Sequence, residues 1–312
     1  MTPTASSTMK RRSPNRTHRR FPPYWRFLVA LLVPGTAFFL LLVWGGLRGP
    51  AFLESWPPAG PGFEPWTIRE PGVDHCRFHR SFPREIRGHV LRFDLGRGDL
   101  ELVVPPARPD SGGRIRADWP LSTLRNNGLV AVVNATPFVP EPILPGGGVR
   151  LDGLAVSDGQ WWSTPVSNLD ALIVDSKGGI RMLQVPGQIP DVRWGAGGFL
   201  VVRRGGTNTF ENTEVDAVTL VGVSPDQRWL YFLVVDGKQP GYSEGLSASE
   251  ASELIGELGA SDAIRMDGGA STTLVLKGSW LGGTVLNRPR NPLYPGLPHP
   301  VGSVFGVRRR QR

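Results

Sequence analysis

The sequence has little cysteine and no familiar cofactor signature. Cys76 is the only cysteine among 312 residues, which excludes an internal disulfide framework, and we expect it to be a buried apolar residue. His75 and His79 have the spacing of a helical metal pair, but no third ligand lies nearby in the sequence. P-loop, Rossmann and G-x-S-x-G patterns are absent. We therefore expect neither a metal nor a cofactor.

Acidic residues are missing from both ends of the chain. Residues 1–26 contribute a charge of +7 and the tail 308–312 contributes +4, which leaves −3 of the total of +8 for the remainder. The basic ends alone would favour a nucleic-acid partner. The body of the chain has no basic patch interleaved with aromatic residues, so we expect no nucleic-acid partner.

One long apolar run is present. Residues 27–47 are uncharged and about long enough to span a bilayer as a helix. Arginines flank this run heavily on its N-terminal side, so the positive-inside rule places residues 1–26 in the cytoplasm and the C-terminal body outside it. A cleaved signal peptide is the alternative, but no small-x-small site follows the run. We expect a single-pass membrane protein whose body is periplasmic or on the cell surface.

The remaining chain divides into two parts. Residues 48–72 are rich in proline and glycine and are expected to form a linker, and residues 73–312 are expected to form one domain. Alternating apolar residues predict four hairpins in this domain. They cover residues 89–105, 151–164, 171–185 and 217–237.

Two helices are expected among these strands. The first is short and covers residues 120–127, and a buried strand at 129–134 follows it. The second begins at the N-cap Ser247, has a capping box with Glu250, and stops at Gly259. The predicted fold class is α+β, with a large mixed or antiparallel β-sheet core and a few packed helices, preceded by one transmembrane helix.

The segment 262–276 has the most distinctive pattern. An apolar strand ends in Asp267, and Gly268-Gly269 and the hydroxyl residues 271–273 follow. The two glycines allow close approach of a ligand to the backbone, and the carboxylate and hydroxyls suit sugar or phosphate chemistry. The alternative is a β-turn in which Asp and Gly serve geometry alone.

Several blocks around this segment resemble the phosphodiester glycosidase family. The similarity is strongest at MDGGASTT (266–273) and includes VVDG (234–237), GLS-x-x-E (245–250) and LGASDA (258–263). Weaker similarity reaches AVVNATPF (131–138) and VLNRP (285–289), so that roughly residues 90–307 are covered. The resemblance implies an enzyme that hydrolyses a sugar-1-phosphate diester, with a phosphoglycan of the envelope or an exopolysaccharide as its substrate.

Three acidic residues are candidates for catalysis. The resemblance implies a catalytic or orienting role for Asp267, since a carboxylate stabilises the oxocarbenium-like transition state of glycoside cleavage. Asp236 could supply a second carboxylate, or it could be only a turn residue. Glu244 is a candidate proton donor on a loop, where the alternative is a solvated side chain.

Other residues are candidates for substrate binding. Asn134 could bind a sugar hydroxyl or hold Asp267, and Phe138 could stack on a sugar ring. Ser271 and Thr272, after the turn at Gly268-Gly269, could hold a phosphate in a backbone nest. The alternative for the last two is an ordinary strand start.

The chain departs from the family pattern at its arginines. The family commonly has an arginine in the strand at 218–222, where this chain has none, and a second one near the C-terminus, where this chain has His299. Arg265 stands where the family usually has asparagine, and arginine is a natural phosphate ligand. Either Arg265 takes over the phosphate-binding charge, or the activity is lost. In the second case the protein is a non-catalytic glycan-binding or polysaccharide-export accessory protein.

Overall fold

The computed structural model describes residues 60–184, 189, 191–278, 282–291 and 296–310. Contacts divide the chain into Met1–Leu53 and Glu54–Arg312, and only the second unit contains described residues. The expected tail and membrane anchor at residues 1–47 lie outside the described residues. In the part that is described, no helix is both long and apolar enough to cross a membrane.

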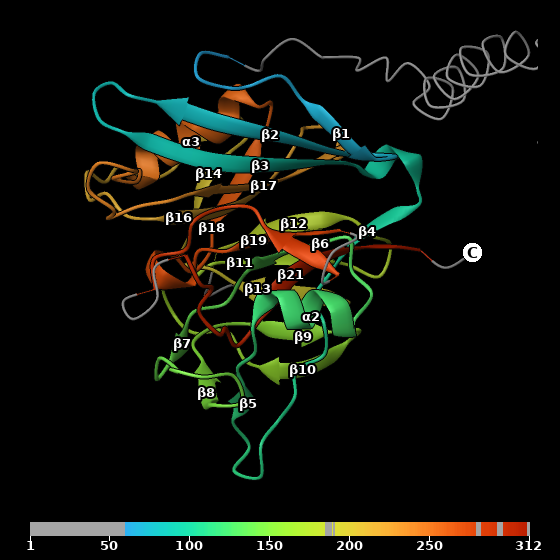
Figure 1. The fold of residues 1–312 in the computed structure, drawn as a ribbon. Helices are drawn as coiled ribbons and strands as arrows, with labels where there is room; N and C mark the ends of the chain where they lie inside the picture. The colour runs from blue at the N-terminus through green and yellow to red at the C-terminus, as the bar shows by residue number, and fades with distance from the viewer. Residues whose placement is uncertain (1–59, 185–188, 190, 279–281, 292–295, 311–312) are drawn as a thin grey trace, which may run out of the picture. The chain divides into compact units, whose positions relative to one another are not determined.

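The largest sheet has eight strands (Figure 1). In spatial order they are β1 (Thr67–Glu70), β2 (Val73–Arg80), β3 (Ile86–Asp94), β17 (Trp229–Val235), β16 (Val218–Val223), β18 (Asp262–Arg265), β14 (Leu200–Arg204) and β15 (Thr207–Asn208).

Three smaller sheets complete the strands. One contains β10 (Gln160–Ser163), β9 (Ala155–Ser157), β13 (Trp194–Gly197), β11 (Ala171–Val174) and β12 (Ile180–Leu183). Another contains β20 (Gly283–Val285), β19 (Leu274–Lys277), β6 (Ala131–Asn134), β21 (Val304–Arg309) and β4 (Leu100–Val103). The smallest contains β5 (Ile115–Arg116), β8 (Gly148–Leu151) and β7 (Phe138–Val139). The helical elements are α2 (Pro120–Asn126), α3 (Ala248–Glu257) and the 3₁₀ turns η1 (Leu95–Arg97) and η2 (Gly269–Ser271).

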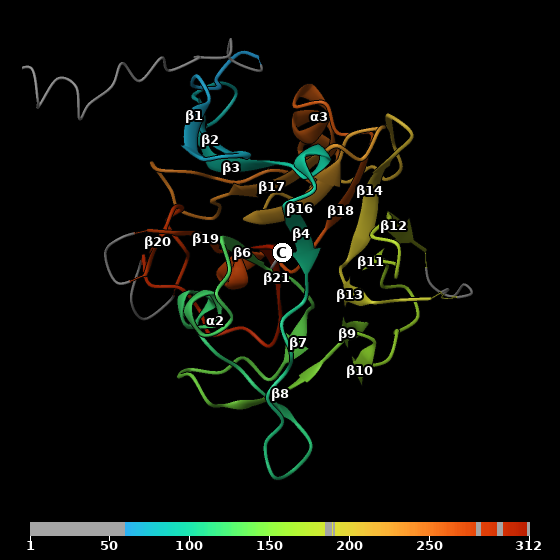
Figure 2. The ribbon, with the colours of Figure 1, turned by 90° about the vertical axis from the view of Figure 1, so that its right-hand side faces the viewer.

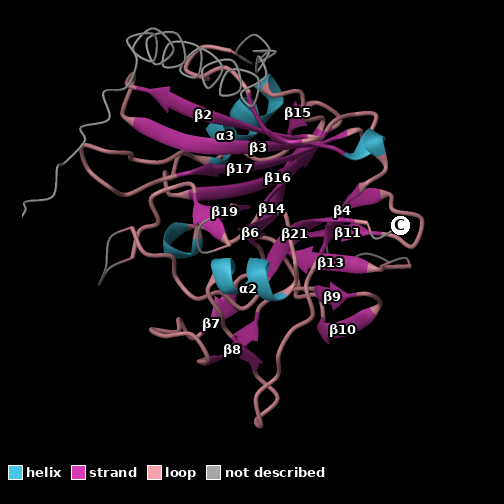
Figure 3. Cartoon of the chain, turned by 45° about the vertical axis from the view of Figure 1, so that its right-hand side comes forward, coloured by secondary structure: helices cyan, strands magenta, loops and turns pink. Residues whose placement is uncertain are grey.

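Both faces of the eight-stranded sheet are covered. One face packs against α3 around Leu254 and Ile255, and the other forms the main core with the two five-stranded sheets. Strands β16 and β17 lie between these two cores, which explains why they read as nearly continuous apolar runs. Strands far outnumber helices in the described part (Figure 3). The α+β class is therefore confirmed, and every strand pair of the described part is antiparallel rather than mixed.

Most predicted local structure is confirmed. Helix α2 matches the predicted short helix, and the capping box between Ser247 and Glu250 is present at the start of α3. The hairpins β9–β10, β11–β12 and β16–β17 form as expected. Asp158 and Gly159 turn the first of them with φ of 47° and 77°, as a tight hairpin turn requires.

The hairpin predicted over residues 89–105 is wrong. β3 pairs with β2 and β17, whereas β4 pairs with β21 in a different sheet. The connection through η1 and Gly98, which has φ of 74°, carries the chain from one sheet to the other. Apolar alternation identifies a strand but not its partner, so two strands that are adjacent in the sequence need not pair.

Part of the segment 48–72, which is expected to be a linker, belongs to the folded domain. Phe63 and Trp66 are buried, and β1 pairs with β2. Phe63 and Trp66 therefore cover the face of the large sheet on which α3 also packs.

Candidate active site

Three strands end at one edge of the core and bring the predicted site residues together. Asn134 is the last residue of β6, Asp236 follows β17, and Asp267 lies just beyond β18. The backbone N–H of Asp267 donates to the carbonyl of Ala135 at 2.9 Å, which joins the large sheet to the sheet of β6. The strand ends of two sheets therefore converge at this point.

Three loops approach the peptide between Asp216 and Ala217 so closely that each has a glycine at the point of contact. A Cβ on Gly237 would lie 2.1 Å from the nitrogen of Ala217, and a Cβ on Gly245 would lie 2.2 Å from the carbonyl oxygen of Asp216. A Cβ on Gly268 would lie 2.7 Å from the carbonyl oxygen of Ala217. The family-like blocks at 234–237, 245–250 and 266–273 therefore pack against the same backbone segment, which only glycine permits.

Asp267 is half-buried and held by its own backbone. Its Oδ1 accepts a hydrogen bond from the N–H of Gly268 at 3.0 Å. Burial raises the pKa of Asp267 to about 6, although hydrogen bonds from Ser271 and Gly268 oppose the shift. A carboxyl group with a pKa near neutrality can change its protonation state at physiological pH.

The side chain of Asn134 holds the Asp267 turn by hydrogen bonds. Its Nδ2 donates to the carbonyl oxygen of Asp267 at 2.7 Å, and its Oδ1 accepts from Thr219 at 2.8 Å and from the N–H of Thr273 at 3.0 Å. The Asn134 side chain has no solvent exposure. Of the two roles considered for Asn134, the geometry favours holding Asp267 over binding a sugar hydroxyl.

Asp236 lies deeper than Asp267, with 1% of its surface exposed. Its carboxylate accepts hydrogen bonds from Asn287 Nδ2 at 2.9 Å, the N–H of Arg288 at 3.0 Å and the Tyr242 hydroxyl at 3.4 Å. Burial raises the pKa of Asp236 to about 6. Asn287 also donates to the carbonyl of Thr272 at 3.0 Å, so Asp236 fixes the loop after β20 against the Asp267 turn. This geometry favours a positioning role for Asp236.

The guanidinium of Arg265 has no hydrogen-bonding partner among the described residues. No hydrogen bond or ion pair joins its guanidinium to another described residue, and its Nε is buried without a partner. The guanidinium lies 5.8 Å from the centre of the Phe199 ring, and Nη2 is 3.7 Å from the position that a Cβ on Gly268 would take. Its charge lowers the pKa of Asp267. A buried donor without a partner is costly, so the side chain is suited to an anionic ligand beside Asp267.

Two further cations lie near these loops. Lys238 Nζ forms an ion pair with Asp216 Oδ2 at 2.8 Å. This oxygen lies 3.9 Å from the position that a Cβ on Gly269 would take. The Arg288 guanidinium stacks 4.8 Å from the centre of the Tyr242 ring. Lys238 therefore has an anionic partner, whereas Arg265 forms no ion pair with a described residue.

The remaining predicted residues are placed less favourably for ligand contact. Phe138 is 8% exposed and belongs to the main core, so little of its ring can stack on a sugar. The N–H groups of Ser271 and Thr272 donate to the carbonyls of Gly268 and Gly269 within η2, which occupies two donors of the proposed nest.

Glu244 is exposed and lies on a loop next to the β2–β3 hairpin. Its backbone N–H donates to the carbonyl of Glu85 at 2.8 Å. Among the described residues, no hydrogen bond or ion pair holds its side chain toward Asp267.

Glu141 is an acidic residue near Asp267 that no sequence motif marks. It is exposed on the loop after β7, and its negative charge contributes to raising the pKa of Asp267. The available signal was its position in the loop that follows the NATPF block. Asn287 was also missed as an individual residue, although it lies within the VLNRP block.

Comparison with known proteins finds a related family and related folds. The profile of the phosphodiester glycosidase family matches residues 127–308, more than half of the chain. The catalytic domain of zebrafish N-acetylglucosamine-1-phosphodiester alpha-N-acetylglucosaminidase, auto-inhibited by its pro-peptide, is a similar structure. It has a TM-score of 0.59 at 17% identity, covering 80% of this chain and 85% of the zebrafish chain. A hypothetical protein from Synechocystis has a TM-score of 0.56 at 14% identity, covering 80% of this chain and 64% of its own. No curated protein matches at the sequence level.

The fold is a sheet-rich α+β domain in which Asp236 and Asp267 follow the ends of two strands. The chain belongs to the phosphodiester glycosidase family.

Proposed function

We propose that this protein hydrolyses the glycosidic C–O bond of a sugar-1-phosphate diester. The observation that carries the proposal is the proximity of the half-buried Asp267 to the guanidinium of Arg265, whose buried Nε has no hydrogen-bond partner among the described residues. The carboxylate would stabilise positive charge at the anomeric carbon, and the guanidinium would bind the phosphate. The activity named for the zebrafish relative supports the same substrate class.

The proposed reaction is a displacement at the anomeric carbon. Water forms a new C–O bond, the glycosidic C–O bond breaks, and its electron pair stays on the phosphate oxygen. The products are a free sugar and a phosphate monoester. Because a phosphate is a good leaving group, the site needs less general-acid assistance than an ordinary glycosidase. Glu141 is the neighbouring carboxylate that would take the proton of the attacking water, and Asn134 and Asp236 would hold the Asp267 turn in position.

We further propose that the activity takes place outside the cytoplasm on envelope or exopolysaccharide glycans. The support is the asymmetry of arginines around the apolar run 27–47, which favours a membrane anchor with the body on the far side. A C-terminal reporter that is active only in the cytoplasm should be silent when fused to the full chain.

Isotope labelling tests the bond that is cleaved. The full chain would be incubated with an aryl phosphodiester of α-N-acetylglucosamine in ¹⁸O-labelled water. We expect the label in the sugar and none in the phosphate monoester. Label in the phosphate would identify a phosphodiesterase instead and would contradict the proposal.

A non-catalytic glycan-binding or polysaccharide-export accessory role is the second candidate. The observations that favour it are the occupied N–H groups of η2 and the buried ring of Phe138. Binding of glycans without turnover of any sugar-1-phosphodiester would support this role.

A further inference from the structure

A second polar cavity lies at the other end of β21 from the candidate active site. Its volume is about 720 Å³, within the size range of small-molecule sites. Val304, at the start of β21, pairs with Asn134 of the candidate site, whereas Arg308 and Arg309 at its end line the cavity. Six residues of extended strand separate the two places by about 17 Å. Residues of β4, β21, β11 and β13 line the cavity, and the C-terminal end of the chain faces the viewer in Figure 2.

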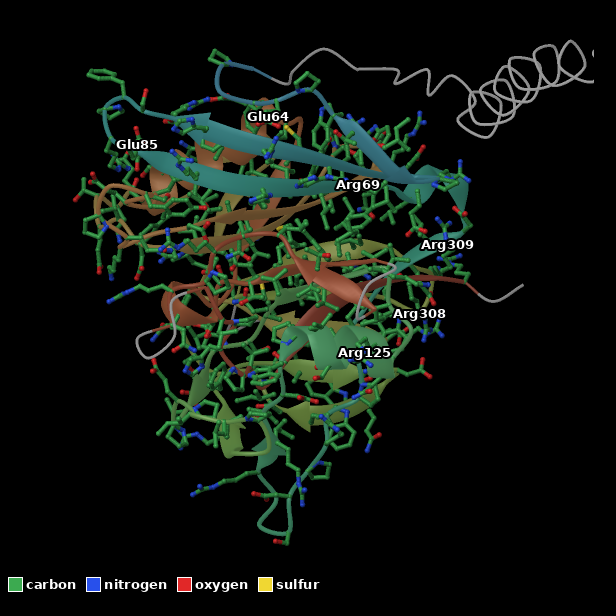
Figure 4. All side chains as sticks on the ribbon, in the orientation of Figure 1. Glu64, Arg69, Glu85, Arg125, Arg308 and Arg309 are labelled. Carbon is green, nitrogen blue, oxygen red and sulfur yellow. The ribbon has the colours of Figure 1, made fainter. Side chains whose placement is uncertain are left out.

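The lining of this cavity is predominantly basic. It contains five cations, Lys177, Arg193, Arg308, Arg309 and Arg310, and two carboxylates, Glu101 and Asp175. In Figure 4, Arg308 and Arg309 lie at the opposite side of the fold from Glu85, which neighbours the candidate-site loops. The C-terminal arginines noted in the sequence therefore converge with residues from other strands.

The ion pairs leave part of this charge unneutralised. Arg308 and Arg310 share the single carboxylate Glu101, at 2.7 and 3.7 Å. Lys177 has no ion pair with a described residue. The backbone N–H of Lys177 donates a hydrogen bond to Oδ1 of Asp175. The carboxylate of Asp175 forms an ion pair with Arg181, which does not line the cavity. Two positive charges of the lining are therefore available to a ligand.

The other two arginines are neutralised from outside the cavity. Arg193 pairs with Asp158 at 2.8 Å, and Arg309 pairs with Asp99 at 2.7 Å. Neither Asp158 nor Asp99 lines the cavity.

An aromatic ring supports the cations. The guanidinium groups of Arg193 and Arg308 each lie 5.2 Å from the centre of the Trp194 ring, which is 5% exposed. Such cation–π contacts restrict both side chains before any ligand arrives. Preorganised cations lose less conformational entropy on binding an anion.

We propose that this cavity binds a small phosphate-bearing ligand of the size of a sugar phosphate. The surplus charge matches a phosphate group, and the polar volume accommodates a sugar beside it. A nucleic acid fits less well, because the cations line a cavity rather than an extended basic stripe with exposed aromatic residues. The site is separate from the one proposed for catalysis and does not depend on it.

Calorimetric titration of the full chain with glucose 6-phosphate tests the proposal. Because Arg265 can also attract a phosphate, the titration is made in an Arg265→Ala background. We expect saturable binding that weakens as sodium chloride is raised, and no binding of glucose. Lys177→Ala and Arg310→Ala should each weaken binding by about tenfold or more, since each removes a charge-assisted contact.

Two control variants make the outcome decisive. Arg150→Ala removes an exposed arginine outside the cavity, and Asp267→Asn alters the other site; neither should change the affinity. Absence of saturable binding in the Arg265→Ala chain would overturn the proposal. So would unchanged affinity in Lys177→Ala and Arg310→Ala, or binding of an oligonucleotide where glucose 6-phosphate does not bind.

Discussion

The two ends of β21 position their polar groups in different ways. At the candidate active site, the buried amides of Asn134 and Asn287 hold backbone carbonyls and the carboxylate of Asp236 through short hydrogen bonds. At the basic cavity, partly exposed side chains form ion pairs such as Arg193–Asp158. Buried hydrogen bonds fix geometry and are costly to break, whereas exposed ion pairs contribute little to stability. The first end is suited to aligning groups for a reaction, and the second to attracting an anion.

The largest effect on stability is expected at the crowded glycines. Gly237→Ala should lower the free energy of unfolding by about 3 kcal/mol or more, because its Cβ would lie 2.1 Å from backbone that cannot move aside. Gly112→Ala is the matched control, since only the Asp110 side chain, at 3.4 Å, approaches its Cβ position. Urea unfolding of both variants measures the difference. Equal stability of the two would show that the loops of the site are less tightly packed than described.

A smaller loss is expected from Asn134→Ala. The change leaves the N–H of Thr273 and the hydroxyl of Thr219 without their shared acceptor, at a cost of about 2–3 kcal/mol. It should also lower turnover, because the Asp267 turn loses the hydrogen bond to its carbonyl oxygen. Unfolding and rate measurements on one preparation separate the two effects. Full activity in a destabilised variant would argue against a positioning role for Asn134.

At the cavity, Arg193→Ala should change stability by less than about 1 kcal/mol, because its ion pair with Asp158 is exposed. Urea unfolding of Arg193→Ala and the wild type measures this difference in stability. If Arg193→Ala lost as much stability as Asn134→Ala, the two ends of β21 would not differ in how strongly their polar contacts stabilise the fold.

The pH dependence of stability tests the raised pKa of Asp267. The pKa of Asp267 is about 6 in the folded protein and near 3.8 when unfolded, so its contribution to stability is present below pH 4 and is lost as the pH rises to about 6. His75 and His89, whose pKa values burial lowers to about 3 and about 4, act in the opposite direction over an overlapping range. The informative quantity is therefore the stability of Asp267→Asn relative to the wild type. This difference should shift in favour of the variant between pH 4 and pH 7, and a constant difference would contradict the raised pKa.

The sequence predicts the local structure well but not its three-dimensional pairing. The capping box of Ser247 and Glu250 and the turn at Asp158-Gly159 are local signals, and both are confirmed. The partner of β4 depends on a strand about 200 residues later, and no local pattern contains that information. The blocks around Asp236 and Asp267 were identified, but their meeting on one peptide depends on contacts between distant loops. For the same reason Glu141 was missed, since a single acidic residue in a proline-rich loop has no distinctive pattern.

Turnover of a sugar-1-phosphodiester by three forms of the full chain tests the proposed site most directly. The wild type should release sugar, and Asp267→Asn should lower kcat by on the order of 10² or more, because it removes the charge that stabilises the transition state but keeps the shape of the turn. Arg265→Ala should mainly raise KM if it contacts the phosphate equally in the ground and transition states. Retention of most of the wild-type rate by Asp267→Asn would show that Asp267 is only a turn residue.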